Sequence, residues 1–204
     1  GILMVGSQDR EFYMLDANNG TVRLHVNTGS GIDGATTVVD GVAYFTTRAG
    51  NVVAFDYSQK DVSFQKAYWH IWLQLWVWNV APRPSLIPGM VWATSLSDTV
   101  MGDLATNDGR LFASTINGRL YALDLNRGTT LWKTEDGGKS YSSPIISGDV
   151  VIQTMSDGLI RGFDVATGEE MWRTSVEKTI TTSPVLAGGT LYVPTTDGHL
   201  FAIK

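Results

Sequence analysis

A unit of about 40 residues repeats along this chain of 204 residues and constrains its fold more than any other feature. The unit is clearest in residues 118–132, GRLYALDLNRGTTLW, and in residues 158–172, GLIRGFDVATGEEMW. A third copy begins at residues 198–204, GHLFAIK, and a degenerate copy covers residues 50–56, GNVVAFD. Because self-similarity at a fixed period marks stacked copies of one supersecondary unit, the chain is predicted to be a repeat protein.

Each unit contains four short runs with strand character, separated by turn signals. In the fourth unit the turns are Ser147 with Gly148, Asp157 with Gly158, and the run ATG at residues 166–168. Four antiparallel strands in about 40 residues is the period of a β-propeller blade. A β-sandwich would not explain the equal spacing of successive units. The sequence therefore predicts an all-β fold, a β-propeller of four-stranded antiparallel blades.

Five blade units are represented, and together they form a single propeller domain or part of one. The first unit lacks its innermost strand, and the last unit lacks its outermost strand, so both terminal blades are expected to be incomplete. We expect the chain to be a fragment, a processed piece or part of a longer polypeptide, with the remaining blades supplied by missing sequence or another chain. The alternative is a compact five-bladed ring with two three-stranded blades. The units cover about residues 1–30, 31–96, 97–136, 137–176 and 177–204.

Aspartate, glycine and tryptophan recur at fixed places in the unit, and each is expected to have a structural role. The carboxylate can accept N–H bonds within a turn, the glycine can supply a positive φ, and the tryptophan can bury its ring between blades. The first unit has Leu24 at the tryptophan position, so its interface is expected to be less tightly filled. The predicted structural residues are Asp16, Asp56, Asp124, Asp164, Gly128, Gly168, Trp92, Trp132 and Trp172.

The period is interrupted once, by an insertion at about residues 60–89. Asp124 and Asp164 are one period apart, whereas the interval from Asp56 to Asp124 exceeds one period by the length of this added segment. The insertion is expected between the third and fourth strands of the second unit. It contains four of the seven tryptophans of the chain: Trp69, Trp72, Trp76 and Trp78.

Two conformations remain open for the insertion, a strand and an amphipathic helix, and residue propensity slightly favours the strand. Its function is also open among packing on its own propeller, a tryptophan-lined ligand pocket, and contact with a protein partner or a membrane interface. The contact hypothesis places a protein partner ahead of lipid. It assigns the contact to Tyr68, Trp69, Trp72, Trp76 and Trp78.

The composition argues against several classes of function. A net charge of -5 does not suit nucleic acid, and the absence of cysteine removes disulfides, thiolate metal sites and cysteine nucleophiles. His25, His70 and His199 lie in different units without ligand spacing, so no metal site is predicted. No catalytic residue and no cofactor are predicted. No segment reaches the ~20 apolar residues that span a bilayer.

The pattern LYALD-x3-G-x3-W resembles the PQQ-like (quinoprotein-type) β-propeller repeat, in residues 117–132 and 157–172 and partly in residues 197–204. Apart from the insertion, the resemblance covers the whole chain. One branch of that family, the quinoprotein dehydrogenases, holds PQQ with calcium over a tryptophan floor, usually beside a vicinal disulfide. This chain has no cysteine, and no calcium-ligand set can be transferred to it. The other branch, the BamB-like envelope propellers, consists of non-enzymatic binding scaffolds.

The resemblance therefore implies a non-catalytic, BamB-like scaffold for protein interactions in the cell envelope. It implies an extracytoplasmic, membrane-associated location, in the periplasm or at the outer face of the cell membrane. The targeting segment would then lie outside this sequence. Two alternatives remain: a fragment of a PQQ- and calcium-dependent oxidoreductase, and the extracytoplasmic sensor domain of a larger receptor.

Overall fold

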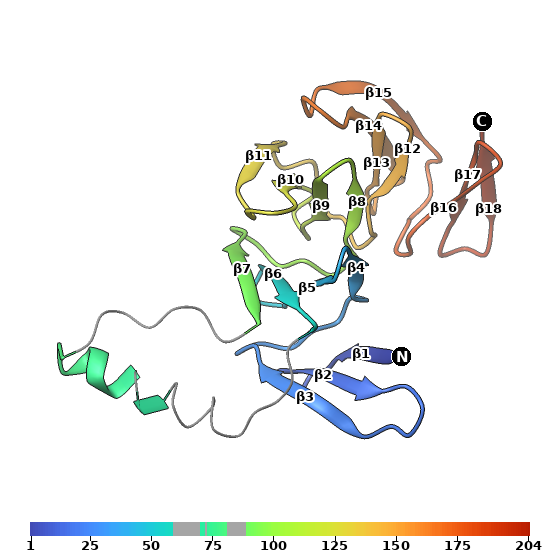
Figure 1. Cartoon of the computed structure of the whole chain (residues 1–204). Coiled ribbons are helices and arrows are strands. Elements are labelled where there is room, and N and C mark those ends of the chain that lie inside the picture. Colours follow the sequence, from blue (N-terminus) through green and yellow to red (C-terminus); the bar gives the residue numbers. More distant parts are fainter. Residues whose placement is uncertain (59–69, 72, 81–88) are drawn as a thin grey trace.

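The computed structural model describes residues 1–58, 70–71, 73–80 and 89–204. Within these residues, five antiparallel sheets follow one another in chain order around an arc, as Figure 1 shows. The first and last sheets have three strands and the three sheets between them have four. The predicted all-β propeller architecture with incomplete terminal blades is confirmed.

Each sheet is one blade, numbered 1 to 5 along the chain. Blade 1 contains β1 (Ile2–Gly6), β2 (Glu11–Asp16) and β3 (Val22–Asn27). Blade 2 contains β4 (Thr37–Val39), β5 (Val42–Thr46), β6 (Asn51–Asp56) and β7 (Met90–Ser95). Blade 3 contains β8 (Ala105–Asn107), β9 (Arg110–Ser114), β10 (Leu120–Asp124) and β11 (Thr130–Lys133). Blade 4 contains β12 (Ile145–Ser147), β13 (Val150–Thr154), β14 (Leu159–Asp164) and β15 (Glu170–Ser175). Blade 5 contains β16 (Val185–Ala187), β17 (Thr190–Pro194) and β18 (Leu200–Ile203).

The outer strand of blades 1 to 4 pairs with its neighbour through a register shift at the same place in every repeat. The shift lies between Met14 and Leu15 in blade 1, and between Ala122 and Leu123 in blade 3. Blades 2 and 4 have it at the equivalent residues. Such an irregularity bends a strand and increases its twist. It lies just before the repeated aspartate, where the chain turns towards the outer strand.

The hydrophobic core lies in the seams, a name we use for the interfaces between neighbouring blades. Each seam has its own cluster of buried side chains, supplied mainly by the middle strands of the two blades that meet there, with some residues from outer strands and loops. In the seam between blades 1 and 2, the rings of Phe12 and Phe45 stack with centroids 4.3 Å apart, and Phe55 lies beside them. Leu24 is buried in the same cluster. A cavity of about 500 Å³, lined by Ile2 and Met4 of blade 1 and by Val38 and Tyr57 of blade 2, lies in the same seam. The seam is therefore packed around the phenylalanine rings and less tightly filled beside them, as the leucine at the tryptophan position predicts.

A hydrogen bond that recurs from blade to blade joins the loops that precede the innermost strands. The backbone N–H of Ala35 donates to Oδ1 of Asp103 at 2.6 Å, and the N–H of Asp103 donates to Oγ of Ser143 at 2.8 Å. The N–H of Ser143 then donates to Oγ of Ser183 at 2.8 Å. These residues occupy one position of the repeat, so the contact passes from each blade to the next through blades 2 to 5.

Candidate functional site

The insertion leaves blade 2 at the turn between β6 and β7. The N–H of Asp56 donates to the carbonyl oxygen of Gly89 at 2.7 Å. The same bond closes the ordinary turn in blade 3, where the N–H of Asp124 donates to the oxygen of Thr129 at 2.8 Å. Residues 57–88 thus stand in the place of residues 125–128. The blade itself is undisturbed, because the bond at the base of the turn is kept.

The described part of the insertion is helical at residues 70–71 and 73–77, so the slight preference for a strand is wrong. The helix ends in a Schellman motif: the N–H of Val80 donates to the oxygen of Leu75, and the N–H of Asn79 donates to that of Trp76, both at 2.9 Å. Asn79 has φ 61°, a left-handed conformation that asparagine tolerates better than most residues. This local cap favours the helix, and propensities summed over tryptophan and valine do not take it into account.

Apolar side chains at the end of this helix are exposed. Trp78 is 70% exposed and Val80 is 72% exposed, and Figure 1 shows the helical residues well apart from the five sheets. We call the exposed members of this group the apolar segment: Ile71, Trp76, Val77, Trp78 and Val80. Contiguous exposed apolar side chains are typical of surfaces that bind a partner, and tryptophan is enriched among the residues that dominate such contacts.

Two of the five residues assigned to this contact from the sequence can be placed. Trp76 and Trp78 belong to the apolar segment. Tyr68, Trp69 and Trp72 lie outside the described residues.

The repeated tryptophans lie in the seams at the outer strands. Trp92 on β7 is 7% exposed and donates its indole N–H to the carbonyl oxygen of Leu125 in blade 3 at 3.0 Å. Trp132 on β11 makes the equivalent bond to Val165 in blade 4 at 3.1 Å. In both seams the ring therefore contacts the turn between the third and fourth strands of the next blade. Trp172 on β15 lines a cavity instead.

The repeated aspartates accept hydrogen bonds from the turn that follows them. Oδ1 of Asp124 accepts the N–H groups of Asn126 and Arg127 at 2.9 and 2.8 Å. Asp164 does the same in blade 4, and Asp16 and Asp56 each accept one such bond. Gly128 and Gly168 complete their turns with φ 68° and 74°. Each aspartate and its glycine therefore stabilise the turn of their own blade.

Protonation of Asp164 should remove part of the stability of its turn. The backbone hydrogen bond from Thr167 is the main reason that the pKa of Asp164 is lower than the ordinary 3.8. A depressed carboxyl pKa contributes stability above the unfolded-state value, about 3.9, which is lost as the pH falls through the folded-state value. We expect Asp164→Asn to lower Tm slightly at pH 7, and the difference from the parent to shrink as the pH falls below the unfolded-state value, because protonation removes the same charge from the parent. Thermal melts followed by circular dichroism across this range would check it, and a Tm difference independent of pH would contradict it.

No group of three or more histidine, aspartate or glutamate side chains among the described residues is arranged to hold a metal ion. In the same part of the chain, no helix is long and apolar enough to cross a membrane.

Comparison with known proteins places the repeat in a family. Residues 77–204 match a family model described as outer membrane protein assembly factor BamB. Among solved structures, BamB from Moraxella catarrhalis superposes with a TM-score of 0.73 at 17% identity, over 98% of this chain and 57% of that one. Quinohemoprotein alcohol dehydrogenase from Comamonas testosteroni has a TM-score of 0.59 at 18% identity, over 81% of this chain and 29% of that one. These similarities concern the fold.

One relative found by sequence similarity is an enzyme. The dehydrogenase subunit of the quinone-dependent alcohol dehydrogenase of Gluconacetobacter polyoxogenes is 29% identical over 109 residues. The match covers 53% of this chain but only 12% of the relative's length. The family-model match, in contrast, covers more than half of this chain, and the protein therefore belongs to the BamB-type family of PQQ-like repeat propellers.

Proposed function

We propose that this protein is a non-catalytic scaffold of the cell envelope and that the apolar segment binds a protein partner. The observation that carries the proposal is the exposure of Trp78 and Val80, which cap a helix that lies apart from the blades. A helix that packed on its own propeller would bury these side chains. Each fully buried apolar side chain of this size contributes about 1.5–3 kcal/mol, so a partner that covered the segment would gain substantial affinity.

The charge of the segment favours a protein over a lipid surface. Residues 70–80 read HIWLQLWVWNV and contain neither lysine nor arginine. Helices that lie in a membrane interface usually combine their apolar face with basic residues that attract anionic headgroups. An extracytoplasmic location is supported by the family description, which names an outer membrane assembly factor.

Paired serine substitutions test the proposal. We expect Trp78→Ser with Val80→Ser to abolish binding of an envelope protein that the parent retains saturably and stoichiometrically, while Tm stays unchanged. The matched control is Leu131→Ser with Val22→Ser, two exposed side chains on outer strands, which should retain the partner. Quantitative pull-down from solubilised envelopes, followed by titration with the purified partner, measures the difference.

Two other outcomes would contradict the proposal. A large loss of Tm on substitution of Trp78 and Val80 would mean that the segment packs on its own propeller. Binding of the parent to vesicles of neutral or anionic lipid, lost in the same variant, would mean that the segment contacts a membrane.

The sequence match to the quinone-dependent dehydrogenase subunit favours a second candidate, a part of a quinoprotein oxidoreductase. That function requires PQQ with calcium, and the described residues offer no metal-ligand cluster. We therefore expect PQQ with calcium to produce neither dye-linked alcohol oxidation nor a thermal shift. A thermal shift that needs both additions would support the enzymatic candidate.

A further inference from the structure

The helix of the insertion is most exposed on one face, which has Gln74 at its centre. The helical hydrogen bonds extend to Trp78, whose N–H donates to the carbonyl oxygen of Gln74 at 3.0 Å. Residues three or four positions apart are neighbours on a helix surface. The neighbours of Gln74 are therefore His70, Ile71, Val77 and Trp78, and all five side chains are exposed. Trp76, on the opposite side of the helix, is 39% exposed, compared with 68% for Val77 and 70% for Trp78.

We call these five residues the outer face, and its two apolar edges flank one amide. Ile71 and Trp78 lie on one side of Gln74, and Val77 lies on the other side with His70. A partner that covers both apolar edges also covers Gln74, so the amide leaves water in the complex. A buried amide without a hydrogen bond is costly. A surface that binds the outer face well therefore offers this amide a hydrogen-bonding group.

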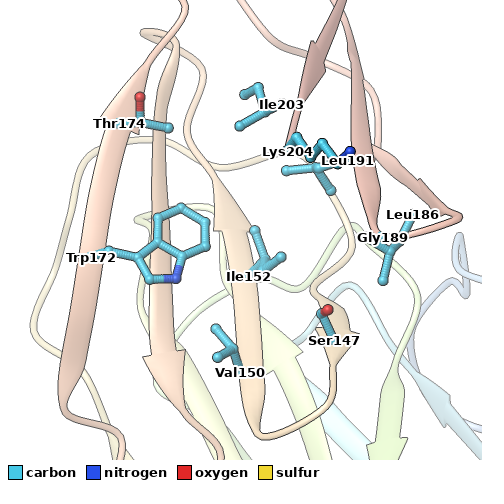
Figure 2. Close-up of a pocket in the computed structure, with 10 residues that line it drawn as sticks. All are labelled: Ser147, Val150, Ile152, Trp172, Thr174, Leu186, Gly189, Leu191, Ile203 and Lys204. Atoms are coloured by element: carbon cyan, nitrogen blue, oxygen red, sulfur yellow. The ribbon is translucent and has the colours of Figure 1, made fainter.

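The outer face projects from the molecule, unlike the other partly exposed tryptophan of the described residues that lies near apolar side chains. Figure 2 shows the ring of Trp172 on the wall of a cavity, with Leu191 and Ile203 on the other side. Trp78, in contrast, belongs to a helix that lies apart from the five sheets in Figure 1. A concave surface buries both edges of such a projecting face more completely than a flat surface does.

We propose that Gln74 determines the specificity of the apolar segment, and that its partner protein has a concave, uncharged surface with a neutral hydrogen-bonding group between two apolar patches. This inference rests on the proposed function. Residues 71–78 read IWLQLWVW and contain no charged side chain. A charged group opposite Gln74 would lose its hydration without gaining an opposite charge, so the group is neutral. The hydrocarbon of a membrane has no such group.

Gln74→Leu tests this inference through the sign of its effect. Leucine is a strong helix former and adds apolar surface, so it would strengthen a purely apolar contact. We expect it instead to weaken binding by at least about fivefold, because the polar group of the partner is then left unpaired. The probe is the envelope protein that the parent retains in the pull-down, purified and titrated by calorimetry. The matched control is Gln8→Leu, at an exposed glutamine of blade 1, which should leave the dissociation constant and Tm unchanged.

Gln74→Glu tests whether the group of the partner is neutral. The new side chain has the same shape and a negative charge, and we expect it to weaken binding of the same protein as well, because the charge is desolvated. Tighter binding of Gln74→Glu would mean that a cation faces the helix and would overturn the inference.

Other outcomes separate this inference from the proposed function. If Trp78→Ser with Val80→Ser abolishes binding but Gln74→Leu binds equally or more tightly, the proposed function stands and this inference fails. If the paired serine substitutions leave binding unchanged, or if the parent retains no envelope protein, both fail. Binding to vesicles of neutral or anionic lipid that Gln74→Leu strengthens would assign the outer face to a membrane and would also overturn both.

Discussion

Gly128→Ala is expected to destabilise the fold by about 3 kcal/mol or more. The new Cβ would lie 2.4 and 2.5 Å from two carbons of the Trp92 ring, far inside van der Waals contact. The substitution also places a side chain at φ 68°, a region that suits glycine. The ring cannot retreat without losing its hydrogen bond to Leu125, so strain and overpacking add. Denaturant unfolding followed by circular dichroism measures the loss.

Gly20→Ala is the matched control for this substitution. Gly20 lies at the same repeat position with φ 72°, but nothing lies within 4 Å of an added Cβ. We expect Gly20→Ala to lower the free energy of unfolding by about 1–2 kcal/mol, because only the strain of a side chain at positive φ is added. Equal losses for Gly20 and Gly128 would show that the docked tryptophan contributes nothing to the requirement for glycine.

Trp92→Ala is expected to cost about 3–5 kcal/mol, the range found when a large aromatic ring is removed from a core. Trp92 is 7% exposed, its ring lies against Tyr44 with centroids 5.9 Å apart, and its indole N–H is bonded to Leu125. The substitution leaves a cavity in the seam between blades 2 and 3 and an unpaired carbonyl oxygen in the turn.

Trp172→Ala provides the comparison, because Trp172 occupies the same repeat position and is 37% exposed. We expect a smaller loss, about 2 kcal/mol, because roughly a third of this side chain stays in water when the ring folds against blade 4. The same denaturant experiment applies to both variants. A cost at Trp172 as large as at Trp92 would mean that the tryptophan stabilises its own blade and that docking adds little.

Blade 2 departs from the repeat at the turn that would face the tryptophan position of blade 1, and blade 1 has a leucine at that position. The insertion replaces the turn that in blades 3 and 4 docks on the tryptophan of the preceding blade. Four positions after Asp56 the chain has Lys60, where Asp124 and Asp164 are followed by glycine. Blade 1 has Leu24 at the tryptophan position, and the seam between blades 1 and 2 contains both stacked phenylalanine rings and a cavity of about 500 Å³.

Several features were predictable from the sequence because they repeat. The equal spacing of Trp92, Trp132 and Trp172 is a property of the chain itself, and the same period carries the strand count, the turns and the incomplete terminal blades. The repeat even locates the insertion, because the interval from Asp56 to Asp124 is too long for one period. Contacts between blades could not be predicted in this way, because each depends on which atoms of the neighbouring repeat come close.

The order of residues was thus sufficient for the fold class, the blade order and the position of the one departure from the period. It could not show that the indole N–H of Trp92 donates to the carbonyl oxygen of Leu125 in the next blade, because that bond depends on how two repeats come together. Nor could it show that the insertion is helical where it is described, since the cap at Asn79 involves backbone bonds several residues apart. The repeat period can be read from the sequence alone, whereas the contacts between blades depend on partners that folding brings together.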